Sequence, residues 1–189
     1  VIGTGAVVRE IYRHLYFNSS YSPLIDIVAA CDVQPEALDG FCRSCNLPAT
    51  TRFSDYRRML GSVELDAVAV NTPDTHHREP VCVALEAGLD VILPKPLAAS
   101  VADAHVMIEA AHRHRRYLGV DYHKRHDPVV LEATRRHRAG HYGSLQVGNF
   151  YMLDRLMVAD PNHEPRFFAS ADFAERNSPV SFLTSHMAD

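Results

Sequence analysis

Two glycines near the start of the chain have the spacing of a phosphate-binding turn. Residues 1–2 indicate the end of a buried strand, and a helix is expected to begin at Ala6. We expect Gly3 to take a positive φ, which glycine adopts without strain, and Gly5 to let a pyrophosphate approach the backbone N–H groups. A dinucleotide fingerprint needs this strand–turn–helix context.

The third small residue of that fingerprint is replaced by Val8, so the glycine pair alone also fits a plain turn. A second signal comes from residues 25–31, an apolar run that predicts a strand and ends at Asp32. An acidic residue at the end of the second strand binds the adenosine ribose hydroxyls in dinucleotide-binding folds. Together these features predict a nicotinamide or flavin site.

The choice of cofactor depends on Asp32. Its carboxylate repels a 2′-phosphate and can accept a hydrogen bond from a free 2′-hydroxyl, and residues 33–35 include no Arg or Lys. We therefore expect NAD rather than NADP. NADP stays the alternative, because Arg43 or Arg52 could reach the phosphate.

Further polar residues follow three other predicted strands, at 65–70, 90–93 and 117–121. They are Asn71, Thr72 and Pro73 after the first, Lys95 after the second, and Tyr122 and His123 after the third. Ligands of parallel sheets bind at the carboxyl ends of the strands. There, the Lys95 ammonium could stabilise negative charge on a ligand or relay a proton. A solvated loop lysine is the competing interpretation.

The elements that must position these residues alternate between strands and helices. Helices are expected at 6–16, 35–45, 54–60 (with Ser54 as N-cap), 74–87, 100–114 and 127–139. This alternation predicts an α/β fold with a doubly wound, mostly parallel sheet. After residue 122 the pattern changes to an alternating strand at 144–154 and a helix from 181. We expect a nucleotide-binding domain at 1–122 and an incomplete second domain at 123–189.

Composition excludes several classes of function. The chain has 189 residues and a formal net charge of −4, so no strong field attracts nucleic acid or anionic membrane. The basic runs at 113–116 and 135–138 are interpreted as helix surface. No apolar run approaches the roughly 20 residues of a membrane span. The chain starts inside a predicted strand, so its true start is expected to be absent. A leader peptide before residue 1 therefore stays an open alternative.

Cysteine and histidine usage predicts no metal site. Cys42 and Cys45 have a C-x-x-C spacing, but neither a second pair nor a histidine cluster accompanies them. Of the 12 histidines, His112, His114, His137 and His141 lie in basic helical stretches, which we interpret as solvated faces. Free thiols are typical of a reducing cytosol.

The order of these motifs resembles the Gfo/Idh/MocA family, which includes glucose–fructose oxidoreductase and inositol dehydrogenase. The opening Val-Ile-Gly-Thr-Gly-Ala resembles the family's cofactor loop, and residues 71–77 resemble its T-P-x-x-x-H segment, with His77 at the histidine. Residues 87–96 resemble A-G-K-H-V-x-x-E-K-P, and residues 121–128 resemble N-x-R-x-x-P. Four motifs in this order are specific, although each is loose alone.

The resemblance implies a Rossmann-type domain followed by an α/β domain with a mainly antiparallel open sheet, which often forms a homo-oligomer interface. It implies hydride transfer between NAD(P) and a carbinol carbon of a sugar or polyol, with Lys95 as the catalytic lysine. The implied cofactor-binding residues are Gly3, Thr4, Gly5, Ala6, Val7, Asp32, Asn71, Thr72, Pro73, His77 and Lys95.

Two positions depart from the family pattern. Pro94 replaces the glutamate before Lys95, and Phe182 replaces an aspartate four residues before His186. Positions four apart share a helix face, so an apolar ring would lie where a carboxylate is usual. His186 is a catalytic acid/base candidate, with a packing role as the alternative. The implied substrate contacts are Lys95, Tyr122, His123, Arg125 and His186.

These observations predict a cytoplasmic NAD(P)-dependent oxidoreductase acting on CH–OH groups of a small sugar, polyol or related substrate. Two alternatives stay open. One is an NAD-dependent, glycosidase-type enzyme with no net redox change. The other is a non-catalytic nucleotide-binding relative, which the residues at 94 and 182 suggest.

Overall fold

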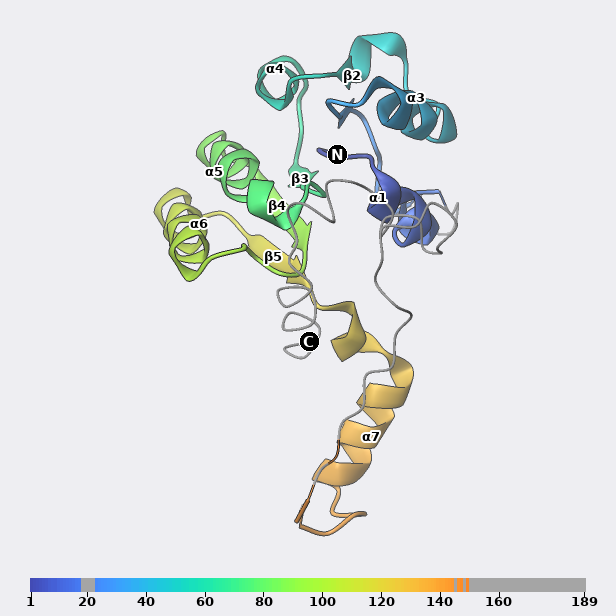
Figure 1. Cartoon of the computed structure of the whole chain (residues 1–189), viewed down its shortest axis with the longest axis vertical. Helices are drawn as coiled ribbons and strands as arrows, with labels where there is room; N and C mark the ends of the chain where they lie inside the picture. The colour runs from blue at the N-terminus through green and yellow to red at the C-terminus, as the bar shows by residue number, and fades with distance from the viewer. Residues whose placement is uncertain (18–22, 145, 148, 150–189) are drawn as a thin grey trace.

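Short parallel strands, connected through helices, form the body of the chain (Figure 1). The structure is a computed structural model, and it describes residues 1–17, 23–144, 146–147 and 149. The expected strand at 144–154 lies largely outside the described residues, and the expected helix from 181 lies entirely outside them. The alternation of strands and helices confirms the predicted doubly wound α/β class.

Five strands pair in two groups. They are β1 (Ala30–Cys31), β2 (Arg52–Phe53), β3 (Ala67–Ala69), β4 (Asp90–Pro94) and β5 (Leu118–Asp121). β1 pairs with β2, and β4 lies between β3 and β5, with every pairing parallel. Ile2 joins the two groups through parallel bridges to Cys31 and Val70. The start of the chain therefore occupies the centre of the sheet, where the winding reverses and α/β folds bind their ligands.

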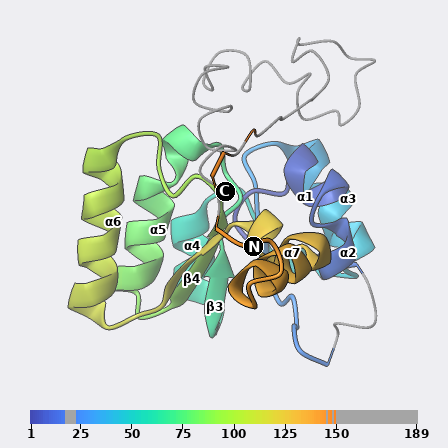
Figure 2. The same cartoon turned by 90° about the horizontal axis from the view of Figure 1, so that it is seen from below.

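Helices cover both faces of this sheet. The α-helices are α1 (Ala6–Glu10), α2 (Arg13–Tyr16), α3 (Pro35–Ser44), α4 (Tyr56–Ser62), α5 (Arg78–Glu86), α6 (Val101–His114) and α7 (Pro128–Arg138). Short 3-10 turns are η2 (Ala49–Thr51), η3 (Asp74–His76) and η4 (His123–His126). α1, α2 and α3 lie on one side, and α4, α5 and α6 lie on the other (Figure 2). α7 extends away from the sheet (Figure 1).

Successive strand residues alternate between two apolar cores. Ala29 and Cys31 belong to the larger core, whereas Ala30 belongs to the smaller one. Such alternation follows from the two-residue period of a strand. The larger core joins Ile2, Val68, Val70, Val91 and Leu93 to Met59, Leu85 and Met107 of α4, α5 and α6. The smaller core joins Ala30 to Val8, Leu38, Phe41, Cys42 and Leu47. The sheet is thus held from both sides.

Two expected elements near the start of the chain are shorter in the structure. The helix expected at 6–16 is broken at Tyr12, which has φ −87° and ψ 3° and whose hydroxyl donates to Asp121 Oδ2 at 2.9 Å. The strand expected at 25–31 pairs only over Ala30–Cys31, because β2 offers only two partners, Arg52 and Phe53.

Helix starts also differ from the expected ones. Asp55, rather than Ser54, caps α4, because its side chain accepts the Arg57 N–H at 2.8 Å. The helix expected at 74–87 divides into η3 and α5, with Pro80 in the first turn of α5, where its missing N–H costs least. α6 begins at Val101, close to the expected start at 100, and Ser100 caps it by accepting the Asp103 N–H at 3.1 Å.

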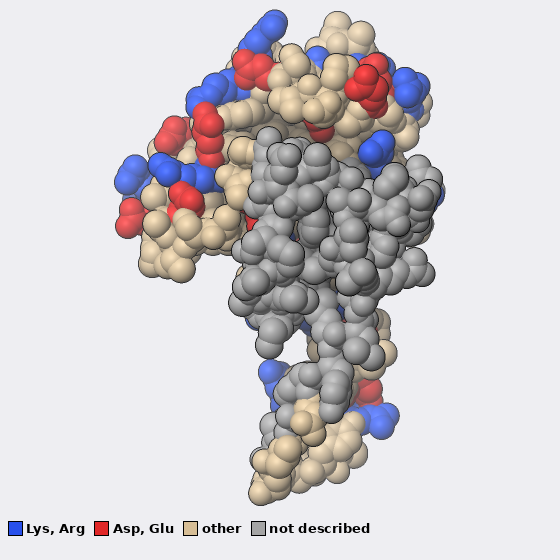
Figure 3. Space-filling model, in the orientation of Figure 1, with Lys and Arg blue, Asp and Glu red and all other residues tan. Residues whose placement is uncertain are grey.

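The surface carries charges of both signs. In Figure 3 the acidic and basic side chains intermix on the face shown, and neither sign gathers into a broad patch. This distribution agrees with the small net charge of −4. Within the described part of the chain, no helix combines the length and apolarity needed to cross a membrane.

We predict that Gly3→Ala lowers the free energy of unfolding by more than about 2 kcal/mol. Gly3 has φ +83°, and a Cβ there would lie 2.7 Å from the Asn71 carbonyl carbon and oxygen. The left-handed backbone alone costs an alanine about 1–2 kcal/mol, and the steric clash adds to it. Urea unfolding measures the change.

The matched control is Gly61→Ala in α4, where a Cβ would meet nothing within 4 Å. That substitution is expected to be neutral or to stabilise by up to about 1 kcal/mol. Equal unfolding midpoints for Gly3→Ala and the parent protein would contradict the close approach of Gly3 to Asn71.

Candidate functional site

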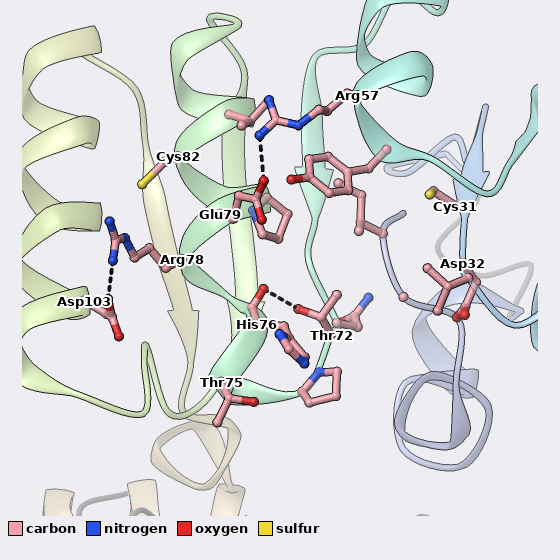
Figure 4. Close-up of a pocket in the computed structure, with 18 of the residues that line it drawn as sticks. Cys31, Asp32, Arg57, Thr72, Thr75, His76, Arg78, Glu79, Cys82 and Asp103 are labelled. Atoms are coloured by element: carbon pink, nitrogen blue, oxygen red, sulfur yellow. Dashed lines mark hydrogen bonds and ion pairs between the residues drawn. The ribbon is translucent and has the colours of Figure 1, made fainter. Parts of the chain in front are cut away.

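A cavity of about 1200 Å³ lies at the carboxyl ends of the central strands and continues beside α5 and α6 (Figure 4). It exceeds the roughly 300–1000 Å³ of a pocket for a drug-sized ligand, so it has room for an extended one. The predicted cofactor residues that line it are Gly3, Gly5, Val7, Asp32, Asn71, Thr72 and Pro73. The structure therefore brings together predicted residues from three separate segments of the sequence.

The glycine turn forms one wall of this cavity. Gly3 has the expected positive φ, and its backbone lies against the Asn71–Thr72 peptide. Gly5 has φ −66°, and a Cβ added to it would meet nothing within 4 Å. Open space beside Gly5 leaves the backbone of the turn accessible, which is the property that close approach of a phosphate requires.

Asp32 is tied to the same turn. Its Oδ2 accepts the Thr4 N–H at 2.6 Å and the Thr4 hydroxyl at 3.0 Å, and its Oδ1 accepts the Gln34 N–H at 2.8 Å. A carboxylate offers about four acceptor positions, so capacity is left for a ribose hydroxyl. Thr4 is fully buried, and its side chain contacts Asp32 rather than the cavity. Thr4 thus holds the carboxylate in place.

Two ion pairs stand on the wall formed by α4, α5 and α6 (Figure 4). Arg57 Nη2 donates to Glu79 Oε1 at 2.7 Å, and Arg78 Nη1 donates to Asp103 Oδ1 at 3.0 Å. Their side chains are at least one-third exposed, and such pairs add little to stability. Because each Arg is paired with a carboxylate, this wall exposes neutralised pairs rather than single charges to a ligand.

Lys95 lies at the same edge of the sheet, one residue after β4. The register pairs Pro94 of β4 with Asp121 of β5, so Lys95 and Tyr122 directly follow paired positions. The Arg125 guanidinium lies 5.0 Å from the centre of the Tyr122 ring. Lys95 and Tyr122 are half-buried, whereas His123 and Arg125 are exposed, and none of the four is among the cavity-lining residues above. His186 and Phe182 lie outside the described residues.

His77 is placed differently from the other expected cofactor residues. Its ring is 1% exposed, Nε2 lies 2.9 Å from the Thr72 carbonyl oxygen, and Nδ1 lies 3.1 Å from those of Pro96 and Leu97. Burial lowers the pKa of His77 below its usual value, while the three carbonyls and Asp74 act in the opposite direction. The ring contacts backbone rather than the cavity, so the expectation of direct cofactor contact does not hold for this side chain.

Contacts between distant segments were not anticipated from the sequence. The Tyr12 hydroxyl donates to Asp121, 109 positions away, and burial, followed by the Asp121 charge, raises the pKa of Tyr12. Asn71 Nδ2 donates to the Tyr16 hydroxyl at 3.3 Å. These bonds connect α2 and its N-cap residue Tyr12 to the ends of β3 and β5. Local patterns carry no signal for them, because each joins residues that are not neighbours in any single element.

The cysteines do not form a metal site in the described part of the chain. All four thiols are free, and Cys31 and Cys42 are buried. Among the described residues, no group of three or more His, Cys, Asp or Glu side chains could hold a metal ion.

A family model described as "Oxidoreductase family, NAD-binding Rossmann fold" matches residues 1–122. Among curated proteins, the inositol 2-dehydrogenase of Acidothermus cellulolyticus is 31% identical over 150 residues, which are 76% of this chain and 41% of that protein. The chain therefore spans about two fifths of the length of that relative.

Solved structures show the same architecture. An aldose–aldose oxidoreductase from Caulobacter crescentus, complexed with glycerol, is 31% identical with a TM-score of 0.57, covering 62% of this chain and 36% of that one. The WlbA dehydrogenase from Bordetella pertussis, in complex with NADH and UDP-GlcNAcA, has a TM-score of 0.67 at 23% identity, covering 75% of this chain and 39% of that one. The second likeness supports the fold.

We predict that Cys31 and Cys45 react slowly with a disulfide reagent in the native protein. Burial raises the pKa of each thiol to about 11, so few thiolates exist at pH 8. The native rate at pH 8 is expected to lie at least about 100-fold below the rate in denaturant and to rise as the pH approaches 11. Mass mapping of the labelled cysteines measures both rates. Rapid native labelling of either cysteine would contradict the prediction.

Proposed function

The chain belongs to the oxidoreductase family with an NAD-binding Rossmann fold, and from this premise we propose that it binds NAD and transfers a hydride to or from a carbinol carbon. The proposed substrate is a sugar, a polyol or a related small hydroxylated molecule. The single observation that carries the proposal is the cleft that brings the glycine turn and Asp32 together beside the strand end that bears Lys95.

The residues of the cleft fit a dinucleotide. The open side of Gly5 would receive the pyrophosphate, and the Asp32 carboxylate, held by Thr4 and Gln34, would accept the adenosine ribose hydroxyls. Asn71, Thr72 and Pro73 would line the cleft next to the glycine turn. When bound, NAD supplies the hydride acceptor, while the protein supplies orientation and charge stabilisation.

The guanidinium of Arg52 favours NAD over NADP in this proposal. Its Nε and Nη2 donate to the Leu47 carbonyl oxygen at 3.1 and 2.6 Å, and Nη1 lies 3.5 Å from Asp39 Oδ1. A guanidinium held in this way is not directed at a 2′-phosphate. Arg43 is exposed on α3, so it stays available to bind the 2′-phosphate of NADP. The Asp32 charge would oppose that phosphate at short range.

In the proposed reaction Lys95 contacts the substrate carbinol oxygen. Its ammonium would donate a hydrogen bond and stabilise the negative charge on the oxygen once its proton is removed, before the hydride leaves; in the reverse direction it would stabilise the charge that develops on a carbonyl oxygen as a hydride arrives. Tyr122, His123, Arg125 and His186 are the proposed further substrate contacts, and His186 is the proposed acid/base. A second domain starting at residue 123 would complete the substrate site, with a homo-oligomer as the proposed assembly and the cytoplasm as the proposed location.

Nucleotide titration tests the binding half of the proposal. NADH fluorescence is expected to report micromolar affinity, tighter than for NADPH, and Asp32→Ala should weaken NADH binding about tenfold, or about 1.4 kcal/mol. Asp32→Asn should narrow the preference for NADH over NADPH, because it removes the repelling charge. Asp26→Asn, at an exposed position, is the matched control. Failure of folded protein to bind either nucleotide would overturn the proposal.

Substitution of Lys95 tests the catalytic half. Lys95→Ala is expected to lower NAD-dependent turnover on a panel of polyols and aldoses at least about 100-fold, with the NADH dissociation constant within about twofold of the parent value. Lys124→Arg, at an exposed position, is the control and should retain turnover. Normal turnover by Lys95→Ala would contradict its role. Glycoside cleavage with retained nucleotide and no net NADH, or binding without turnover, would replace the proposed reaction with one of the alternatives.

A further inference from the structure

His77 lies between the two loops on which the proposed function depends. One loop contains Thr72, which lines the cavity next to Gly3. The other contains Lys95, followed directly by Pro96 and Leu97. The His77 ring reaches the Thr72 carbonyl oxygen on one side, at 2.9 Å, and those of Pro96 and Leu97 on the other, both at 3.1 Å. A single side chain therefore spans the gap between the Thr72 loop and the Lys95 loop.

The ring is built into the fold in a way that keeps its position. It is 1% exposed, and His77 itself is the N-cap residue of α5, directly after η3. Leu97 packs against the larger core, which α5 also helps to form. With its backbone anchored on one element and its nitrogens directed at two others, the ring has little freedom to turn.

The three neighbours of the ring are all acceptors. A carbonyl oxygen accepts a hydrogen bond but cannot donate one, so each ring nitrogen contributes a bond only when it carries a proton. The neutral ring has one N–H and holds one of the two loops by a hydrogen bond, whereas the protonated ring would hold both. The two nitrogens thus have separable roles, Nε2 toward Thr72 and Nδ1 toward the Lys95 loop.

We propose that His77 is a positioning residue that sets the place of the Lys95 loop relative to the Thr72 loop. One ring nitrogen donates a hydrogen bond to one loop while the ring contacts the carbonyl oxygens of the other, so that the Lys95 ammonium is held at the strand end beside the cleft. This inference rests on the proposed function of Lys95 and of the cleft. His77 acts through backbone carbonyls and contacts neither the cofactor nor the substrate.

Two substitutions separate the roles of the two nitrogens. In His77→Gln the amide nitrogen can occupy the position of Nε2, so the contact with Thr72 is kept and those with Pro96 and Leu97 are lost. In His77→Asn the amide nitrogen can occupy the position of Nδ1, so the contacts with the Lys95 loop are kept and the one with Thr72 is lost. His112→Gln, an exposed histidine of α6, is the matched control.

The composition of the chain offers a direct readout of Lys95. The sequence contains only two lysines, Lys95 and Lys124. In a Lys124→Arg background, reductive methylation with ¹³C-formaldehyde gives one lysine signal, which NMR separates from that of the terminal amine. The chemical shift of this signal and its midpoint in a pH titration report the surroundings of Lys95, with and without NADH, and need no turnover.

We expect the Lys95 signal of the parent and of His112→Gln to shift when NADH binds. In His77→Gln the shift should fall to less than half and the pH midpoint should move, with the NADH dissociation constant within about threefold of the parent value. His77→Asn should retain most of the Lys95 response and bind NADH more weakly. Where turnover is measurable, His77→Gln should lower kcat more than it raises KM.

The outcomes distinguish this inference from the proposed function. If NADH binds to the parent protein but does not change the chemical shift of Lys95, the proposed role of Lys95 is overturned, and the inference with it. A parent response that is unchanged in both folded His77 variants would overturn the positioning role alone. Unfolding of both variants would also overturn it, because the ring would then serve the fold as a whole.

Discussion

The close approach of Gly3 to the Asn71–Thr72 peptide is the contact on which the candidate site depends. A Cβ at Gly3 would lie 2.7 Å from the Asn71 carbonyl, so no other residue lets the first turn lie so near the end of β3. This contact places the glycine turn and the Asn71–Pro73 loop side by side, and both line one cleft. From Thr72 the chain of contacts continues through His77 to the loop that carries Lys95. The glycine turn, the Thr72 loop and the Lys95 loop are therefore positioned relative to one another by direct contacts.

At the carboxyl ends of the strands, hydrogen bonds to the backbone orient the polar side chains at least as much as ion pairs do. Asp32 receives two backbone N–H groups, and His77 faces three backbone carbonyls. Backbone partners do not change rotamer, so they hold a carboxylate or a ring at a fixed orientation without the entropy cost of ordering a second long side chain. The exposed pairs of Arg57 with Glu79 and of Arg78 with Asp103 contribute less to this order.

The sequence alone predicts those parts of the site that local patterns determine. The positive φ of Gly3, the place of Asp32 after β1 and the alternation of strands and helices each follow from a few neighbouring residues. The side-chain partners across the fold were not predictable in this way. Tyr12 and Asp121, Thr4 and Asp32, and His77 with Pro96 meet only after the sheet has formed. The resemblance to the family indicated that His77 matters, but it could not show that the ring bonds to backbone.

The continuity of the sheet depends on very few residues. Among the described residues, Ile2 alone bridges β1 on one side and the segment after β3 on the other. Four backbone hydrogen bonds make this seam: Ile2 N–H to Ala69, Gly3 N–H to Cys31, Cys31 N–H to Val1 and Asn71 N–H to Ile2. Within the sheet the two halves of the fold are thus joined by one narrow seam, to which the larger core and the bond of Tyr12 to Asp121 add further contacts. Amide protons at this seam exchange with solvent only when the halves separate, so their exchange rate reports the opening of the cofactor cleft itself.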